Sequence, residues 1–449
     1  KRVNGKGESM TFENKGKENN GATYGRRSDW QNLYTIAKKY YEALLADPGN
    51  AQFHLTDPRG ASDKSGRTFN NPYQYFFEQM HMDDAIYADE SIYEYPMQQG
   101  GGNDGRPYSF GRPSSGGSKA AYPCKSYGQG RINPAYFYGI FDPNDMRRDV
   151  SITMTGSNGK GVEKLIPFVP NSKAEGGGLT LNKWDENRQA NPWVAAQRKS
   201  GINGPYMRMS EVYLGYAEVC AALGDVVTGK QYLKTVRERS FPQGLADTDG
   251  FIASFGNDLV RAIIEERGFE YAGEGDRRWT LIRSGYLPED IKRIKDMTKA
   301  MMDGLATKGY YEFENGNIIS AYIWTKLVDA KTIYGHRLTA QCPMDKVNDP
   351  VLYPGWRGQK DNWEEMGYNS KQEAINDFWG YPSDESNIEA VETSIRKYAK
   401  AIVDTLNLYG YDGFGVLIWL IIEMNMISIC FGIMITFRLL SICGRLLLM

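Results

Sequence analysis

The chain has 449 residues, which is enough for two domains or for one large domain with insertions. Its 53 Lys and Arg residues against 55 Asp and Glu residues leave it close to neutral, so a polyanion such as nucleic acid is not implied as a partner. The 30 Tyr, 9 Trp and 18 Phe residues are more informative, because flat rings can stack on sugar rings. Tyrosine-rich loops can also pack only against their own domain, and composition leaves both interpretations open.

Cysteine and histidine are sparse. The five Cys residues form no close pair and no metal-type spacing, and the three His residues lie far apart and outside any HExxH pattern. We therefore expect no cofactor, no metal ion and no catalytic residue.

The first clear element is a helix over residues 30–46. The preceding Ser28 and Asp29 are good capping residues, and the Pro48-Gly49 pair ends the helical pattern. The residues before it are polar, without an apolar signal region, and indicate the start of a fragment. Apolar residues at helical spacing predict the buried face, formed by Leu33, Ile36, Ala37, Tyr40 and Leu44.

Residues 71–97 predict a second helix followed by a short strand over 91–95. In this strand Ile92 points to one side and Tyr93 and Tyr95 point to the other, because side chains alternate along a strand.

Residues 98–130 have no period and are rich in Gly, Ser and Pro. Loops of this length are uncommon, and are either functional or disordered. Aromatic rings beside amide, carboxylate and guanidinium groups are typical of carbohydrate recognition. The candidate ligand-binding residues are Asn103, Asp104, Arg106, Tyr108, Phe110, Tyr122 and Tyr127. The alternative is a flexible loop whose tyrosines only anchor it.

The segment 141–149, FDPNDMRRD, has the acidic residues of a calcium loop, but Met146 stands where an oxygen ligand is needed. We expect a turn with paired charges.

Residues 207–239 predict a helical hairpin. Ser210, Leu214, Ala217 and Ala221 form a face of mostly small residues, which lets a second helix approach closely. Gly224 ends the first helix, and a second apolar series begins after it.

The next segment carries Glu266, Glu270 and Glu274 at steps of four, interleaved with arginines. Clustered carboxylates could serve in acid–base catalysis. We favour structural ion pairs, because each carboxylate has a fork-shaped donor available. The residues predicted to form these pairs are Glu266, Arg267, Glu270, Glu274 and Arg278.

This long spaced pattern resembles the SusD/RagB family of surface glycan-binding lipoproteins of Gram-negative bacteria, over about residues 20–345. The residues that carry the resemblance are Arg208, Glu211, Leu214, Ala217, Glu218, Leu223, Gly224, Val236, Arg237, Arg239, Glu266, Arg267, Glu270, Glu274, Gly275, Arg277 or Arg278, Leu281, Ile282 and Arg283. The resemblance implies a mainly α fold of TPR-like helical hairpins, with long irregular loops and a few short strands. It also implies glycan contacts from loops near residues 98–130.

By the same resemblance, the protein is not an enzyme. It would lie in the outer membrane facing the cell surface, capture oligosaccharides or other nutrients, and pass them to a SusC-like TonB-dependent transporter. Members carry a lipid anchor, which is missing from this chain. The alternatives are a helical-repeat adaptor that binds only protein and, less favoured, a glycoside hydrolase.

The C-terminal part departs from this family. Residues 368–415 resemble a helix and strand of the family 18 glycosidase barrel, with Ile395, Tyr398, Ile402 and Leu406 marking an amphipathic helix. The catalytic acids do not follow. We therefore divide the chain into a SusD-like domain (1–353), this fragment (368–415) and a hydrophobic tail (416–449). We expect truncation near Tyr353 to leave the helical domain folded.

The tail allows three interpretations. It is rich in Ile, Leu, Met and Cys, and charged residues interrupt it before it reaches the roughly 20 residues of a membrane span. We favour an artefactual gene end over a membrane-seeking segment or a core element.

Overall fold

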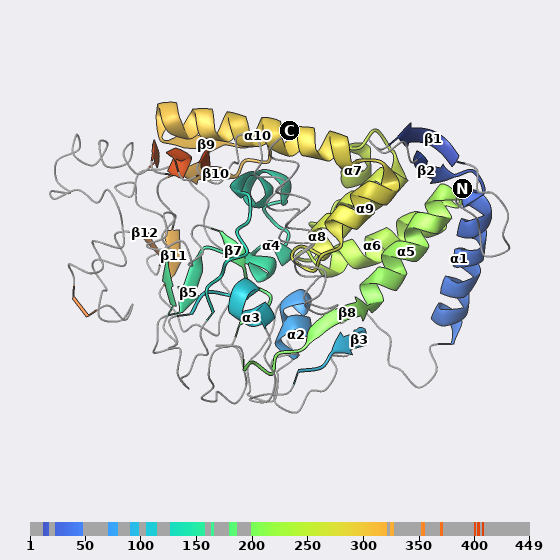
Figure 1. Cartoon of the computed structure of the whole chain (residues 1–449), viewed down its shortest axis with the longest axis horizontal. Helices are drawn as coiled ribbons and strands as arrows, with labels where there is room; N and C mark the ends of the chain where they lie inside the picture. Colours follow the sequence, from blue (N-terminus) through green and yellow to red (C-terminus); the bar gives the residue numbers. More distant parts are fainter. Residues whose placement is uncertain are drawn as a thin grey trace.

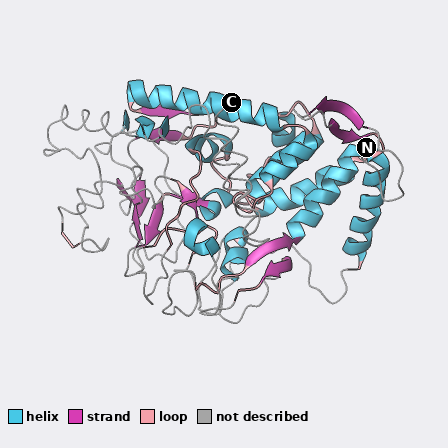
Figure 2. Ribbon diagram, in the orientation of Figure 1, coloured by secondary structure: helices cyan, strands magenta, loops and turns pink. Residues whose placement is uncertain are grey.

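The computed structural model describes residues 12–17, 23–47, 71–79, 90–97, 105–114, 126–157, 163–165, 179–185, 199–320, 324–326, 352–354, 369–370, 399–400, 402–404 and 406–407. Helices dominate these residues (Figures 1 and 2). They are α1 (Trp30–Ala46), α2 (Pro72–Gln79), α3 (Gly105–Phe110), the π-helix η1 (Tyr136–Ile140), α4 (Arg147–Ser151), α5 (Met209–Ala222), α6 (Val226–Arg239), α7 (Thr248–Ala253), α8 (Leu259–Glu270), α9 (Arg277–Ser284) and α10 (Leu287–Lys308). The predicted mainly α fold is confirmed.

The strands are short, and each sheet in the described residues has two of them. They are β1 (Phe12–Lys17), β2 (Thr23–Arg27), β3 (Ser91–Tyr95), β4 (Ile152–Thr153), β5 (Thr155–Ser157), β6 (Glu163–Leu165), β7 (Thr180–Leu181), β8 (Gly204–Arg208), β9 (Tyr310–Glu312), β10 (Ile318–Ser320), β11 (Trp324–Lys326) and β12 (Leu352–Pro354). All pair antiparallel, and the β3–β8 pair joins segments that lie far apart in the sequence. The predicted strand over 91–95 is confirmed.

Helices α5 and α6 form the predicted hairpin. Gly224 has a φ of 90°, a left-handed conformation that glycine adopts without steric cost, and it turns the chain out of α5. Asp225 then caps α6, since its carboxylate accepts a hydrogen bond of 3.2 Å from the amide of Thr228.

Small residues set the distance between these two helices. A Cβ atom added at Gly229 of α6 would lie 3.0 Å from the carbonyl oxygen of Ala217 and 3.2 Å from the Cβ of Ala221. Ser210, Leu214 and Ala217 are fully buried, so the predicted packing face of α5 is confirmed. The hairpin therefore depends on close backbone approach.

Two apolar cores hold the helices together. One core lies where α8 packs against α5 and α6, and it contains Leu214, Leu233, Val236 and Ile263. The other core surrounds η1 and the inner side of α10, which runs along one edge of the molecule (Figure 1).

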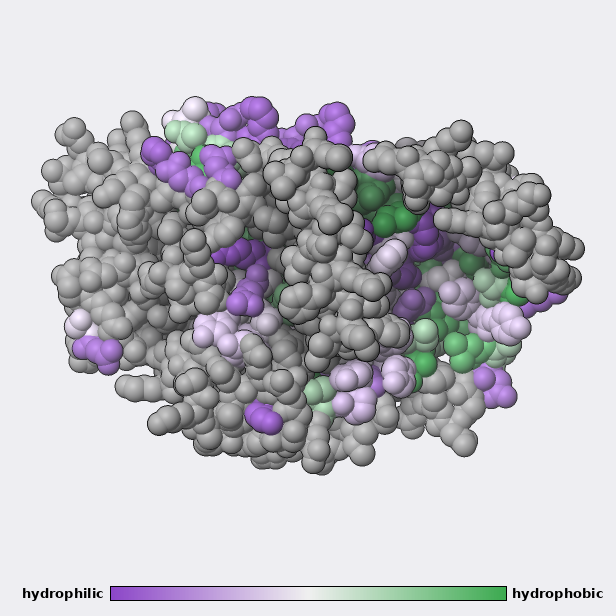
Figure 3. Space-filling view, in the orientation of Figure 1, coloured by the Kyte–Doolittle hydropathy of each residue, from purple (hydrophilic) through white to green (hydrophobic). Residues whose placement is uncertain are grey.

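Helix α1 has the predicted bounds, but three of the five residues of the predicted buried face are exposed. Leu33, Ile36 and Tyr40 are 37, 44 and 75 % exposed. The helix instead packs through Tyr34, Ala37, Tyr41 and Leu45 against a cluster on α5 that contains Val219 and Cys220. In Figure 3 hydrophobic side chains accordingly show on the surface over α1 and α5.

The stretch 98–130 is more regular than predicted in its described residues. It contains helix α3, and Ser114 pairs with Ser126 in an isolated β-bridge. The amide of Tyr127 donates to the carbonyl oxygen of Tyr108 over 2.8 Å. These contacts bring the two ends of the stretch together.

Residues near the end of the described chain belong to the main core. Ala399, Ile402 and Leu406 are 0, 2 and 2 % exposed and lie in the same cluster as η1 and α10. This finding weighs against the expectation that truncation near Tyr353 leaves the helical domain folded, because these side chains fill part of the core. Truncation there should remove core contacts.

No helix in the part of the chain that the structure describes is long and apolar enough to cross a membrane. The tail over 416–449 lies outside the described residues, so its three interpretations stay open.

Candidate functional site

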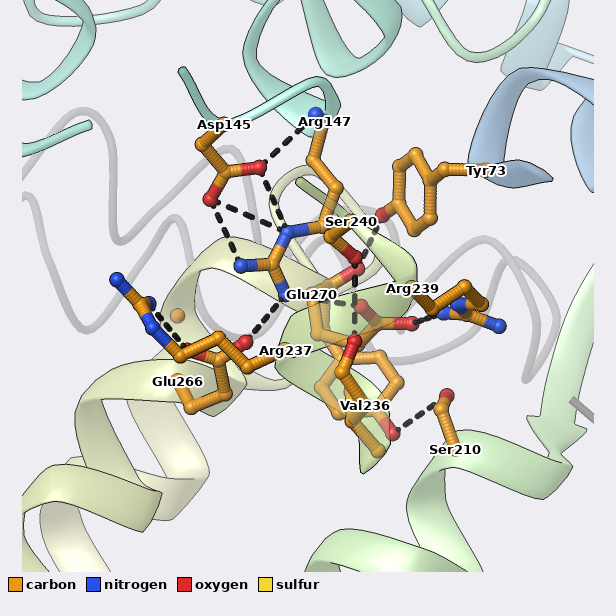
Figure 4. Close-up of polar contacts among 12 residues, drawn as sticks. Tyr73, Asp145, Arg147, Ser210, Val236, Arg237, Arg239, Ser240, Glu266 and Glu270 are labelled. Carbon is orange, nitrogen blue, oxygen red and sulfur yellow. Dashed lines mark hydrogen bonds and ion pairs between the residues drawn. The ribbon is translucent and has the colours of Figure 1, made fainter. Parts of the chain in front are cut away.

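The centre of the scaffold is a group of buried charges around α8. Its Glu266 and Glu270, one turn apart, are both fully buried. Arg147 of α4 lies between them, with Nη1 at 2.7 Å from Oε1 of Glu266 and 3.0 Å from Oε2 of Glu270. Its Nη2 atom lies 2.7 Å from Oδ2 of Asp145 (Figure 4). The predicted turn with paired charges over 141–149 is confirmed.

Further arginines reach the same two carboxylates from other elements. Arg237 of α6 places Nη1 3.0 Å from Oε2 of Glu266, and Arg239 places Nη2 2.5 Å from Oε1 of Glu270. Arg208, at the end of β8, also pairs with Glu270. The group therefore ties α4, α6, α8 and β8 together, and Figure 4 shows its members from α4, α6 and α8.

Glu274, one turn beyond α8, extends this group of charges. Its Oε1 atom lies 2.9 Å from Nη2 of Arg208 and 2.6 Å from Nζ of the buried Lys183. Arg267 pairs with Asp276, with Nε at 3.2 Å from Oδ2. Glu274 and Arg267 thus lie within ion-pair distance of oppositely charged groups, as Glu266 and Glu270 do.

Arg278 is the remaining residue of the predicted ion pairs. Its neighbour Arg277 is the buried one, with Nη2 at 2.7 Å from Oε2 of Glu265 and 2.9 Å from Oδ2 of Asp290. Arg278 lies with its guanidinium 5.6 Å from the centre of the Trp279 ring. Arg277 was not among the predicted ion-pair residues, yet it is buried and paired.

The surroundings of Glu270 decide what its carboxylate can do. Burial alone would raise the pKa of Glu270, but Arg239, Arg208 and Arg147 outweigh burial and hold the pKa well below its ordinary value. A carboxylate that stays ionised cannot deliver a proton near neutral pH. The geometry of this group therefore fits a structural role.

The predicted ligand-binding residues of 98–130 fall into three groups. Asn103, Asp104 and Tyr122 lie outside the described residues, and Arg106 is placed only through the backbone of α3. Tyr108 and Tyr127 are half-buried and meet edge to face, with ring centres 5.1 Å apart. Phe110 is only 7 % exposed and lies in the main core, which corrects its assignment as a ligand contact. Its ring anchors α3.

A second group of aromatic rings lies on β3 and β8 and is well exposed. Tyr93, Tyr95 and Tyr206 are 52, 43 and 56 % exposed. We call these three residues the tyrosine ribbon. The rings of Tyr93 and Tyr206 meet edge to face, with centres 5.6 Å apart and an interplanar angle of 86°. Strands β3 and β8, which carry the ribbon, lie in the lower part of the molecule in Figure 1.

Buried polar residues fix this ribbon from the opposite side. Glu94, between the two exposed tyrosines of β3, is fully buried and accepts a 3.0 Å hydrogen bond from Nδ2 of Asn203. The other side-chain atom of Asn203, Oδ1, accepts a 2.9 Å hydrogen bond from the amide of Met97. These hydrogen bonds fix the strand that carries the rings. A ligand that binds the rings would therefore lose less conformational entropy from the protein.

The sequence pattern could identify part of the tyrosine ribbon. The alternation over 91–95 already placed Tyr93 and Tyr95 on one side of a strand. Tyr206 gave no such signal, because its position beside Tyr93 depends on the pairing of β3 with β8.

The described residues thus combine a helical hairpin with exposed tyrosines on a short strand pair. The chain belongs to the SusD family, whose model matches residues 51–354, more than half of the sequence. This match confirms the predicted resemblance. SusD-like proteins are glycan-binding proteins, and the expectation that this protein is not an enzyme agrees with that family.

Individual relatives are distant. SusD-like protein P25 of Formosa agariphila is 28 % identical over 160 residues, which cover 35 % of this chain and 26 % of that protein. A SusD homologue from Bacteroides thetaiotaomicron is 16 % identical with a TM-score of 0.39, over 62 % of this chain and 51 % of that one. Surface glycan-binding protein A of the same organism, solved in complex with laminarihexaose, is 19 % identical with a TM-score of 0.36, over 57 % of this chain and 51 % of that one. The chain thus spans about half the length of these solved structures.

Proposed function

We propose that this protein binds oligosaccharides at the cell surface and passes them to a TonB-dependent transporter of the outer membrane. The observation that carries the proposal is the exposed tyrosine ribbon on a scaffold of the SusD family. Tyrosine suits sugars because its ring covers the apolar face of a pyranose while its hydroxyl reaches the polar edge.

The ribbon provides three rings within one short strand pair. A good aromatic contact contributes about 0.5 to 1.5 kcal/mol beyond area burial. Tyr108 and Tyr127 are proposed as a second contact region, together with Asn103, Asp104, Arg106 and Tyr122 from the same stretch. Two such regions favour an oligosaccharide over a single sugar, since each adds modest affinity.

The transporter partnership and a lipid anchor in the outer membrane are the further parts of the proposal. Apolar side chains exposed on the helical scaffold support a protein partner there. Leu33 and Ile36 are 37 and 44 % exposed on α1, and Trp279 and Ile282 are 51 and 44 % exposed on α9. Exposed apolar residues of this kind are common where proteins meet. The same residues would serve a protein-only adaptor, which would bind no glycan.

Calorimetry with a panel of neutral oligosaccharides tests the proposal. Tyr206→Ala and Tyr93→Ala should each weaken binding about two- to tenfold, the range expected for one stacking contact. The matched control is Tyr310→Ala, because Tyr310 is 39 % exposed on a different strand pair. Equal losses in all three variants, or no binding of any neutral oligosaccharide, would contradict the proposal.

A further inference from the structure

A cavity of about 680 Å³ lies against the charged group around α8 and shares none of its described lining residues with the tyrosine ribbon. It is bounded by the end of η1, by α7, α8 and α10, and by the turn between β9 and β10. This volume suits a small organic ligand of one or two rings. None of the predicted site residues lines it.

Aromatic rings form much of the described wall. Phe269 and Phe313 are buried at the bottom, while Phe251, Phe255 and Tyr311 are partly exposed to the cavity. Phe251 and Phe255 meet edge to face with ring centres 5.3 Å apart. The wall can therefore cover the apolar body of a ligand.

The buried charges at the bottom already have partners. Asp145 pairs with Arg147, and Arg237 pairs with Glu266. Glu265 pairs with an arginine on the cavity wall, Arg293, over 2.6 Å. These groups leave little net charge at the bottom of the cavity.

The rim is different, because it carries carboxylates without a cationic partner. Asp142 and Asp247 accept only backbone hydrogen bonds, from Asn144 and Gly250. Within the described part of the chain, no ion pair neutralises either of them or Glu314. Anions are therefore disfavoured here, and a cation is attracted.

A metal ion does not fit this arrangement. Among the described residues, no group of three or more His, Cys, Asp or Glu side chains is placed so that it could hold one ion. Carboxylates spread around an aromatic wall suit an organic cation instead, since an ammonium group gains from both charge-assisted hydrogen bonds and ring faces.

We propose that this cavity binds a ligand with a protonated amino group, whose body lies against Phe251 and Phe255 and whose ammonium group lies by Asp142, Asp247 or Glu314. The amine can come from an amino sugar or from a free organic amine, and the chemistry of recognition is the same. This site does not depend on the tyrosine ribbon, which would bind neutral sugars.

Calorimetry on the full chain with three probes tests the proposal. They are a β-1,4-linked glucosamine disaccharide, its N-acetylated counterpart and the diamine cadaverine. The free amino disaccharide should bind about tenfold or more tightly than the acetylated one, because acetylation removes the charge. Added salt should weaken its binding. Tighter binding of the disaccharide than of cadaverine assigns the site to amino sugars, and the reverse order assigns it to free amines.

A matched pair of variants locates the binding. Glu314→Gln should weaken amine binding about tenfold, whereas Glu312→Gln should leave it unchanged, since Glu312 is exposed nearby but does not line the cavity. Equal binding of acetylated and free disaccharides, equal effects of the two variants, or no binding of either amine would overturn the proposal. Neutral-oligosaccharide binding that depends on Tyr206 would persist in each of these cases, so the two proposals fail separately.

Discussion

The group of charges around α8 and the tyrosine ribbon reverse the usual places of polar and apolar residues. Around α8, carboxylates and arginines are buried and paired, whereas on the ribbon tyrosine rings are exposed. Buried charges are costly unless each one finds its partners, so they fix how the helices meet. Exposed rings cost little and remain available to a ligand. The contrast separates a region that maintains the shape of the protein from a region that we propose recognises a ligand.

The largest expected effect is in the buried group. Glu270→Gln should lower the free energy of unfolding by about 3 to 5 kcal/mol, because Arg147, Arg208 and Arg239 would lose the carboxylate that neutralises them. Urea denaturation followed by circular dichroism measures this loss.

Lys292→Ala is the control for that variant. Lys292 and Asp296 form an exposed ion pair in α10, 78 and 63 % accessible, and such pairs contribute at most about 1 kcal/mol. If Glu270→Gln kept full stability and lost glycan binding, the charged group would be a binding site. The contrast between a structural charged group and a ligand-binding tyrosine ribbon would then be wrong.

Leu406→Ala tests where the shape-maintaining region ends. Leu406 is 2 % exposed in the main core, so its truncation should cost about 2 to 5 kcal/mol, measured by the same denaturation. Lys400→Ala, at an exposed residue of the same segment, should cost less than about 1 kcal/mol. Equal, small effects would mean that residues beyond Tyr353 add nothing to the fold.

Acid should weaken the buried group selectively. The pKa of Glu270 is lowered in the folded protein, so this residue adds stability above its unfolded pKa, near 4.5, and the contribution is lost as the pH falls below that value. The stability difference between the wild-type protein and Glu270→Gln should therefore be largest at neutral pH and shrink below about pH 4. A difference that stays constant with pH would show that charge is not its cause.

Local pattern predicted much of the helical scaffold. Steps of three and four residues place the α5–α6 hairpin, and Gly224 with Asp225 places its turn. The steps of four in α8 also placed Glu266 and Glu270 together, since residues one turn apart share a face.

Partners distant in the chain could not be predicted in this way. Helix α1 has apolar residues on more than one side, and the buried side is set by contacts with α5, such as the 3.2 Å hydrogen bond from Tyr34 to Glu218. Arg277 was not predicted as a buried ion-pair residue, because only the fold brings its partners Glu265 and Asp290 to it. Phe110 was assigned to the ligand site although it packs in the main core, and Tyr206 was missed although it lies beside Tyr93. In both cases the contacts come from segments that lie far apart in the sequence.

The most direct test of the central claim measures stability and neutral-oligosaccharide binding together for Tyr206→Ala and Glu270→Gln. Tyr206→Ala should unfold within about 0.5 kcal/mol of the wild-type protein and bind glycan about two- to tenfold more weakly. Glu270→Gln should be less stable but, under conditions where it is folded, bind glycan normally. The opposite result, a stable Glu270→Gln without binding and an unstable Tyr206→Ala with full binding, would contradict the division between shape and recognition.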